Sequence, residues 1–209
     1  MLKHLLAICI LVACAAFTLS PALAEDDDVA TVSRLRNAAA VIRQGQQINI
    51  QVGHKLRKFD EIKSGENARV EIIFNDGTKL NIGADCHIII DEFLFDPDEN
   101  IGIAILRALQ GPFRFITGRI GKVLQPQVVV QSPFGIVGVR GTDFWAGPSR
   151  GVYGVLLLDG SISVTNPLGQ RILTTPGTGV NLTGNSAPPG EVTVWGAGRA
   201  QEALADVAF

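Results

Sequence analysis

The sequence predicts an all-β fold, either a twisted β-sandwich or a short β-solenoid, with a short helix in a C-terminal tail. Glycine accounts for 23 of the 209 residues, well above the roughly 7% of an average protein. β-Branched and aromatic residues recur in short runs between the glycines. This composition is typical of short strands joined by tight turns.

The clearest element is a hairpin in ARVEIIFNDGTKLNIG, residues 68–83. Apolar and polar residues alternate on both sides of Asp76-Gly77, as they do in strands with one buried face. A two-residue turn would place apolar residues opposite polar ones, whereas a three-residue loop ending at Thr78 matches apolar with apolar. The predicted pairs are Phe74 with Leu80 and Ile72 with Ile82.

A second Asp-Gly pair lies in VYGVLLLDGSISVT, residues 152–165. Here a two-residue turn at Asp159-Gly160 matches the apolar positions, and it would pair Leu157 with Ile162 and Val155 with Val164. The two stretches share the form strand, Asp-Gly, strand. This weak repeat keeps the solenoid open as an alternative to the sandwich.

The remaining elements follow the same patterns. Two short segments have helical spacing, Ile101–Leu109 and, at the C-terminus, Gly198–Val207. Further strands are expected at Ala38–Ile42, Gln47–Gln51, Ile88–Phe95, Phe113–Ile116, Val128–Gln131, Phe144–Ala146 and Arg171–Thr174.

Residues 1–24 have the pattern of a Sec-type signal peptide: basic Lys3, an apolar run and small residues before an acidic cluster. We expect cleavage between Ala24 and Glu25, and a periplasmic or secreted protein. Lipidation at Cys14, within the lipobox-like Leu-Val-Ala-Cys, is a weaker alternative. Residues 30–183 form the predicted all-β domain and residues 184–209 the tail.

Composition excludes several classes of function. No later apolar run approaches the roughly 20 residues of a membrane helix, so no membrane span is expected after processing. The formal net charge of −2 gives no basis for binding nucleic acid. Cys86 is the one cysteine beyond the signal peptide, so no intramolecular disulfide is expected. No cofactor motif is present.

Two segments carry a resemblance to a known family. VVVQSPFGIVGVRGTDFWA (residues 128–146), followed by GVLLLDGSISVTNPLG (residues 154–169), resembles the signature of the FecR domain. The upstream hairpin and LQGPFRFITG, residues 109–118, agree with the family in the same order. The positions that match its motif are Gly138, Val139, Arg140, Gly141, Thr142, Phe144, Asp159 and Gly160.

The resemblance implies a non-enzymatic, exported β-domain that recognises a protein partner in the cell envelope. Well-known FecR proteins are membrane-anchored regulators with a cytoplasmic segment that binds a sigma factor. Here a signal peptide begins the sequence, so we expect a free-standing secreted member without the anti-sigma role. A structural protein that binds envelope or matrix carbohydrate is the alternative.

The motif itself raises two further interpretations. We expect GVRGTDFW to link two core strands, with Arg140 partly buried and paired with Asp143 or Asp159. A strained turn could instead let the Thr142 hydroxyl attack the Gly141 carbonyl, which would make the protein self-processing. The predicted core comprises Val137, Val139, Phe144, Val155, Leu157, Ile162 and Val164.

Other candidate sites have weaker support in the sequence. No nucleophile elbow of a hydrolase is present. Asp85 and His87 could converge as metal ligands, and the acidic runs 25–28 and 96–100 could bind calcium, but both lack a motif's spacing. We therefore expect no catalytic residue and no metal. The aromatic residues at strand spacing are expected in the core, with Trp195 as the best exposed candidate for a sugar platform.

Overall fold

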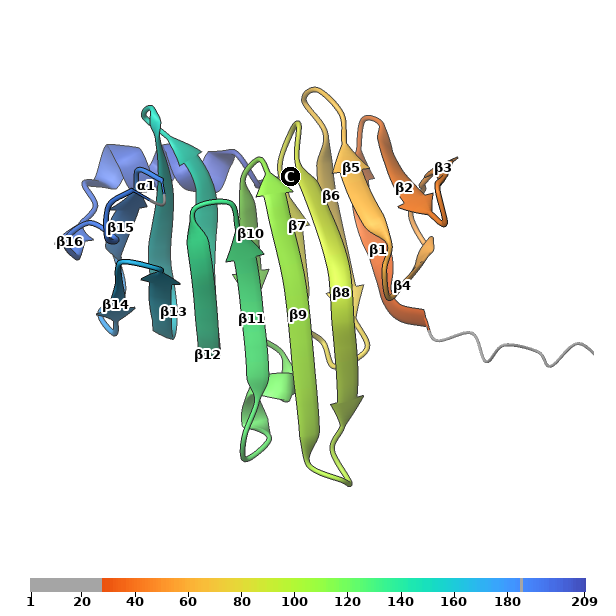
Figure 1. The fold of residues 1–209 in the computed structure, drawn as a ribbon. Coiled ribbons are helices and arrows are strands. Elements are labelled where there is room, and N and C mark those ends of the chain that lie inside the picture. Colours follow the sequence, from red (N-terminus) through yellow and green to blue (C-terminus); the bar gives the residue numbers. More distant parts are fainter. Residues whose placement is uncertain (1–27, 185) are drawn as a thin grey trace, which may run out of the picture.

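The computed structural model describes residues 28–184 and 186–209. The expected signal peptide, its cleavage point between Ala24 and Glu25, and Cys14 therefore lie outside the described residues. The described chain is one large mixed sheet of 16 strands with one short C-terminal helix (Figure 1). The all-β fold and the tail helix are confirmed. No helix in these ranges is long and apolar enough to cross a membrane.

The sheet folds back on itself and encloses its core between two layers (Figure 1). The front layer contains, in spatial order, β3 (Gln46–Asn49), β2 (Ala39–Arg43), β5 (Glu61–Ser64), β8 (His87–Asp96), β9 (Ile101–Gln110) and β11 (Gln127–Ser132). The back layer contains β10 (Phe113–Ile116), β7 (Lys79–Ile82), β6 (Arg69–Phe74), β1 (Asp28–Arg36) and β4 (Lys55–Arg57).

A contact between aromatic rings shows how the layers meet. The rings of Phe74 on β6 and Phe93 on β8 stack with centroids 4.6 Å apart, although the two strands are not neighbours in the sheet. Their contact therefore crosses the core from one layer to the other. Among the described strands only β9 and β11 pair in parallel, whereas the repeats of a β-solenoid stack as parallel strands. The packing and the pairing together identify the sandwich and exclude the solenoid.

Two long strands join the layers. β12 (Gly135–Ser149) pairs with β11 through its first half and with β10 through its second half. β13 (Val152–Asn166) returns beside it after a turn at Arg150-Gly151, where both φ angles are positive. It continues each layer by pairing with β14 (Gly169–Leu173) in front and with β15 (Thr178–Leu182), followed by β16 (Thr193–Val194), behind.

This hairpin corrects two predictions. GVRGTDFW does not link two strands but lies within β12, and Asp159-Gly160 is not a turn but lies within β13. The observed pairs are Val139 with Ile162 and Phe144 with Leu157. Asp159-Gly160 instead faces a bulge in β12, where the register shifts between Arg140 and Asp143. Such bulges bend strands at the corners of sandwiches.

The hairpin of β6 and β7 has the predicted loop length at a different position. Ile72 pairs with Leu80 and Val70 with Ile82, so the three-residue loop is 75–77 and not 76–78. The Asp76 carboxylate fixes this position because it accepts hydrogen bonds from the Thr78 amide at 2.8 Å and the Thr78 hydroxyl at 2.7 Å. The register changes by two residues, so each side chain keeps its predicted face.

The helix expected at residues 101–109 is wrong, because this segment is strand β9. Apolar residues occupy both faces of the strand: Ala104 and Leu106 point into the core, whereas Ile103 and Ile105 point outward and are half-buried. This continuous apolar run has no period of two and therefore imitates a helix. β9 pairs in parallel with β11.

The core contains every residue that the sequence predicted for it. Val137, Val139, Phe144, Val155, Leu157, Ile162 and Val164 are all at most 6% exposed. The short 3-10 helix η1 (Arg119–Lys122) closes one end of the sandwich with the buried side chain of Ile120. The other expected strands are confirmed within β2, β3, β8, β10, β11, β12 and β14.

The C-terminal tail covers the outer side of the back layer. The predicted helix is confirmed as α1 (Ala197–Ala205), which packs with Trp195 against Trp145 and Leu156. Arg69 donates a hydrogen bond to the Ala205 carbonyl at 3.4 Å, so the tail reaches β6. Trp195 is only 6% exposed, which corrects its expected role as an exposed aromatic residue.

Candidate partner-binding site

The outer face of the front layer is unusually apolar for a sheet face turned to solvent. Register places Ile105, Val129, Gly138, Ser163 and Ile172 in one row across β9, β11, β12, β13 and β14. The exposed face of an antiparallel sheet normally carries polar residues. Three of these five residues are large and apolar, which makes this face a candidate binding surface.

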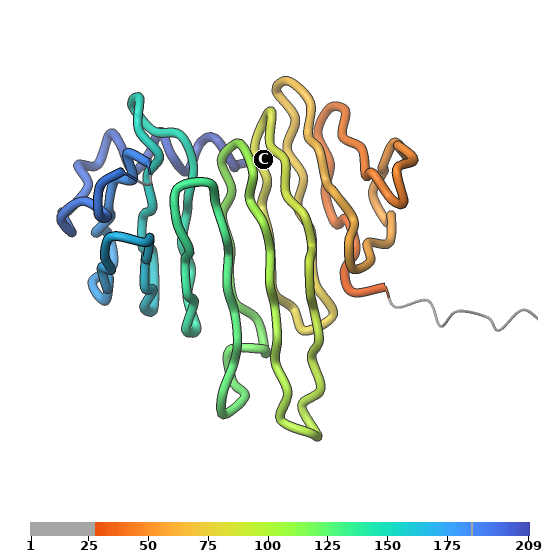
Figure 2. Tube along the Cα trace, viewed as in Figure 1, coloured from red at the N-terminus to blue at the C-terminus, as the bar shows by residue number. Residues whose placement is uncertain are grey.

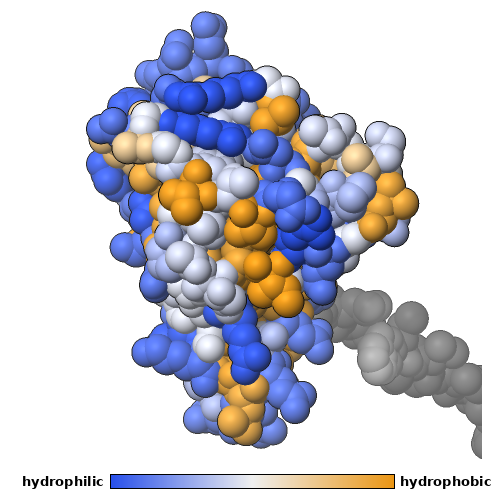
Figure 3. Space-filling model, turned by 90° about the vertical axis from the view of Figure 1, so that its left-hand side faces the viewer, coloured by the Kyte–Doolittle hydropathy of each residue, from blue (hydrophilic) through white to orange (hydrophobic). Residues whose placement is uncertain are grey.

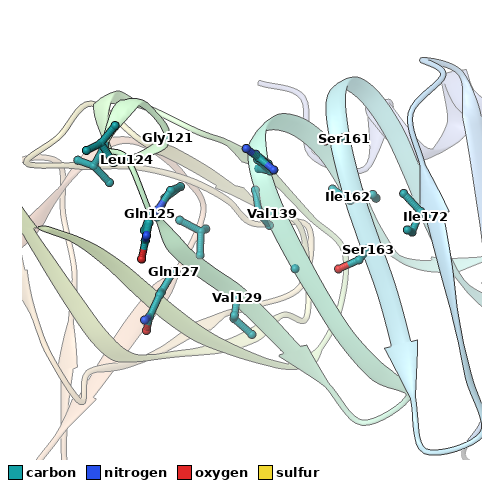
Figure 4. A pocket seen from close by; sticks show the side chains of 15 residues that line it. Gly121, Leu124, Gln125, Gln127, Val129, Val139, Ser161, Ile162, Ser163 and Ile172 are labelled. Atoms are coloured by element: carbon teal, nitrogen blue, oxygen red, sulfur yellow. The ribbon is translucent and has the colours of Figure 1, made fainter. Parts of the chain in front are cut away.

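A groove of about 870 Å³ crosses this row (Figure 4). Side chains from four strands line it, and segment 121–126 forms one end (Figure 4). Arg140 is the one charged residue among those lining it. The uncharged polar side chains are Gln125, Gln127, Ser161 and Ser163.

Gly138 of the family motif shapes the groove. A Cβ at this position would lie 2.6 Å from the hydroxyl oxygen of Ser163 on the neighbouring strand. Any larger residue would therefore displace Ser163 and fill the groove. Because glycine has no side chain, Gly138 leaves this part of the groove open.

Arg140 does not have the environment that the sequence suggested. Its side chain is exposed at the groove, and no hydrogen-bond or ionic partner for it occurs in residues 28–184 or 186–209. Asp143 binds Arg114 instead, with nitrogen–oxygen distances of 2.8 and 2.5 Å. These bonds raise the pKa of Arg114. Asp159 is exposed on β13, so the predicted ion pair of Arg140 is wrong.

Thr142 is buried at the bend of β12. Its amide donates to the Thr117 hydroxyl at 3.0 Å, and its carbonyl accepts from the Thr117 amide at 2.8 Å. Its own hydroxyl oxygen has no hydrogen-bond partner in the described part of the chain. Gly141 has φ +59, as a left-handed turn requires, but no base among the described residues is hydrogen-bonded to the hydroxyl to activate it.

The sheet has open edges, and they differ in character. β3 and β4 carry mostly polar and charged side chains, and β16 is two residues long. These are common ways of protecting an edge from further strands. β14 pairs only with β13, and Ile172 on it is 63% exposed. Figure 3 shows apolar surface among hydrophilic residues at this end of the molecule.

The backbone of β14 is also available for pairing. β13 and β14 are joined by a two-residue loop, with Asn166 opposite Gly169. In such a hairpin the amide and carbonyl groups of Gln170 and Ile172 point away from β13. In the part of the chain that the structure describes, no further strand pairs with them. The Gln170 carbonyl accepts a hydrogen bond from the exposed Arg171 guanidinium at 3.3 Å, which a partner strand would replace.

Comparison with protein families identifies the central part of the chain. The model of the FecR protein matches residues 60–163. This segment belongs to the FecR domain family. The FecR segment includes the motif, Arg140 and most of the groove, whereas β14 and α1 lie beyond its last matched residue.

Two solved structures resemble the chain in fold. One is a candidate anti-sigma factor from Parabacteroides distasonis ATCC 8503, with 20% sequence identity and a TM-score of 0.50. Another structure under the same description has 18% identity and a TM-score of 0.47. Each match covers 64% of this chain and 57% of the other, so the FecR-containing chain matches little more than half of their length. No curated protein matches the chain.

The other candidate residues have structural partners. His87 lies 3.1 Å from a Glu61 carboxylate oxygen, and no group of three metal-ligating side chains occurs among the described residues. Asp96 accepts hydrogen bonds from the amides of Asp98 and Glu99 and thereby orders the β8–β9 turn. Cys86 is buried, and burial raises the pKa of its thiol, which disfavours the nucleophilic thiolate form.

Sequence reasoning missed the apolar outer face and the unprotected edge. A signal for the apolar outer face was present in IGIAILRAL, residues 101–109, because its apolar residues occupy both alternating positions. A strand that is apolar on both faces must be covered on both faces or bind a partner. The open edge at β14 could not be predicted from the sequence, because the topology of the whole sheet decides which strands have a neighbour on each side.

Proposed function

We propose that this chain is a non-enzymatic signalling module of the cell envelope that recognises a protein partner by accepting an extended partner strand at β14. Membership of the FecR domain family and the fold shared with a candidate anti-sigma factor support a signalling role and a protein partner. Strand addition to an exposed edge is a common mode of peptide recognition.

The open edge of β14 carries this proposal. The outward amide and carbonyl of Ile172 and the outward amide of Gln170 can form a ladder with a partner strand once it displaces Arg171 from the Gln170 carbonyl. Ile172 and Leu168 offer apolar contacts beside it. Leu168 is 54% exposed in the loop before the strand. Main-chain hydrogen bonds would supply affinity and the side-chain contacts would supply specificity.

Site-specific crosslinking tests the edge in living cells. A photoreactive amino acid replaces Gln170, and a second strain carries it at Gln47 on β3 as a control at the opposite edge. We expect one defined protein partner to be captured from position 170 and not from position 47. The partner is then purified to measure binding directly.

Two substitutions of Ile172 distinguish the contribution of its backbone amide to partner binding from that of its side chain. Ile172→Pro removes the outward amide and should abolish binding of the purified partner. Ile172→Thr keeps both the amide and a β-branched side chain, so it should retain most of the affinity. Equal binding by both variants would contradict strand addition at this edge.

The proposal requires that the protein is exported through the Sec pathway. The signal-peptide pattern of residues 1–24 supports it. Sequencing of the mature N-terminus should give Glu25, and the protein should fractionate with the periplasm or the medium. A mature protein that begins at a lipidated Cys14 would favour the lipoprotein alternative.

Carbohydrate binding is the weaker alternative. Sugar platforms need exposed aromatic rings, whereas Phe113, Phe115, Phe144 and Trp145 are each at most 1% exposed. Phe59, at 69%, is the one strongly exposed aromatic residue in the described ranges. Retention on peptidoglycan that is lost in Phe59→Ala would favour this alternative.

A further inference from the structure

Two residues of β12, two positions apart, determine the chemistry of the groove. Gly138 and Arg140 both lie on the outer face of the sheet, because strand residues alternate between faces and Val139 between them is buried. They are therefore about 7 Å apart along the strand. The trace shows β12 between β11 and β13, with β14 beyond β13 (Figure 2). One strand thus offers the groove a cation and a position without a side chain.

The surface over Gly138 is hollow and has apolar side chains on both sides. Val129 of β11 lies on one side, and Ser163 of β13 lies on the other with Ile172 of β14 beyond it (Figure 4). The strands that carry Val129 and Ile172 are three spacings apart, about 14 Å. This leaves room for one large apolar side chain of a ligand, which would remove both side chains from water.

Arg140 is the charged group in the groove without a partner. It is exposed, and no hydrogen-bond or ionic partner for it occurs in residues 28–184 or 186–209. Its neighbours in register are the uncharged Gln127 and Ser161. A guanidinium binds carboxylates and phosphates through paired N–H donors. Phosphate carries almost two negative charges and is usually bound by clusters of arginine, whereas a single arginine matches the single charge of a carboxylate.

The size of the groove suits a short segment of chain. Its volume of about 870 Å³ is in the range of ~300–1,000 Å³ that is typical of sites for drug-sized molecules. An extended segment presents alternate residues to the same face about 7 Å apart, which is the spacing of Arg140 and Gly138. It can therefore place a carboxylate at Arg140 and an apolar side chain over Gly138. A second buried charge in the segment would lack a partner among the lining residues.

We propose that this groove binds an extended segment of a protein partner, in which an aspartate or glutamate pairs with Arg140 and a large apolar residue two positions away lies over Gly138. The proposal rests on the proposed function in one respect, that the ligand is a protein. It does not depend on strand addition at β14, because Arg140 and Gly138 are on β12, two strands from that edge.

Selection from random hexapeptides displayed on phage tests this recognition before the partner is known. The mature protein is immobilised and the recovered peptides are sequenced. We expect enrichment of Asp or Glu, with a large apolar residue two positions before or after it and uncharged residues elsewhere. The most enriched peptide is synthesised with an amidated C-terminus, so that its acidic side chain is its one carboxylate. Its dissociation constant is then measured by calorimetry.

Substitutions of Arg140 test the charge pair. Arg140→Gln keeps a long polar side chain and should weaken binding of the amidated peptide on the order of tenfold or more, as loss of a hydrogen bond to a charged group does. Changing the acid of the peptide to its amide should weaken binding to the wild type and have little further effect on Arg140→Gln. Arg140→Glu should instead bind a version of the peptide with lysine in place of the acid.

Lys79→Gln is the matched control for Arg140→Gln. Lys79 is exposed on the outer face of the back layer, and the substitution changes the net charge of the protein by the same amount. The variant should bind the amidated peptide like the wild type, because Lys79 lies outside the groove.

Gly138→Val tests the apolar position separately. A Cβ there lies 2.6 Å from the Ser163 hydroxyl oxygen, so valine fills the hollow, and strands favour β-branched residues. A new selection on this variant should keep the preference for an acid and lose the preference for a large apolar residue. Circular dichroism checks its fold; if the fold is lost, the Arg140 variants decide.

Three results would overturn the proposal. They are recovered peptides that are not enriched in acidic residues over the input library, an amidated peptide that Arg140→Gln binds as tightly as the wild type, and a Lys79→Gln variant that loses as much affinity as Arg140→Gln. Crosslinking from Gln170 reports on the β14 edge, and Gln170 is not among the residues that line the groove. Either proposal can therefore fail while the other stands.

Discussion

Gly141 and Gly160 face each other where the β12–β13 hairpin passes from the front layer to the back layer. Both have positive φ, +59 and +78, and a Cβ on Gly160 would overlap the carbonyl oxygen of Gly141. The bend therefore requires a residue without a side chain on β13. It allows one hairpin to close the sandwich on both layers.

Gly160→Ala should strongly destabilise the protein. The left-handed conformation alone costs about 1–2 kcal/mol for alanine, and the overlap with the Gly141 carbonyl adds to it. Gly151→Ala in the β12–β13 turn is the control, because φ is +83 there and nothing lies within 4 Å of the added Cβ. Urea denaturation should show a larger loss for Gly160→Ala; equal losses would contradict a packed bend.

The stacked pair Phe74 and Phe93 should couple the layers energetically. Phe74→Ala should lower the free energy of unfolding by ~3–5 kcal/mol. A double-mutant cycle with Phe93→Ala should give a coupling of ~0.5–1.5 kcal/mol. Leu182→Ala on β15 is the distant control and should be additive with Phe74→Ala. No coupling between the two phenylalanines would argue against their contact.

Much of the fold was predictable because local patterns determine which side chain faces the core. The predicted core residues around Val137 and Val164 are buried, since alternation fixes a face whatever the partner strand. The β6–β7 register was wrong by two residues for a local reason. The Asp76 carboxylate accepts hydrogen bonds from the Thr78 amide after the loop and from the Ile120 amide of η1, and propensity alone does not reveal this.

The long hairpin was not predictable from local patterns. An Asp-Gly pair between apolar runs normally indicates a turn, but at Gly160 the left-handed residue serves a bend inside a strand. Gly160 lies inside a strand and not in a turn because β12 pairs with both halves of β13. A local sequence pattern does not show this long-range pairing. The wrong partner predicted for Arg140 has a similar cause, because Asp143 is bound by Arg114 on the neighbouring strand β10.

The tail helix should be an integral part of the fold. Trp145 is fully buried beneath it, and its ring lies 6.0 Å from that of Trp195. Removal of residues 196–209 should expose Trp145, shift tryptophan emission to the red and lower the unfolding free energy. The loss should be a few kcal/mol, since each buried large apolar side chain contributes ~1.5–3 kcal/mol.

A point variant controls for the truncation. Ala203→Asp places a charge in the cluster beneath α1 and should reproduce the red shift. Glu202→Ala removes only the exposed ion pair with Arg150, so emission should not change. A truncated protein with unaltered emission would show that the tail does not protect Trp145.

The Gly141-Thr142 peptide bond should remain intact. Attack by the Thr142 hydroxyl on the Gly141 carbonyl needs a base that removes the hydroxyl proton, and no described residue is hydrogen-bonded to that oxygen. Intact mass spectrometry of the mature protein after prolonged incubation should therefore give one unbroken chain. A fragment that begins at Thr142 and disappears in Thr142→Val would establish self-processing, and the burial of that hydroxyl would then be part of the reaction.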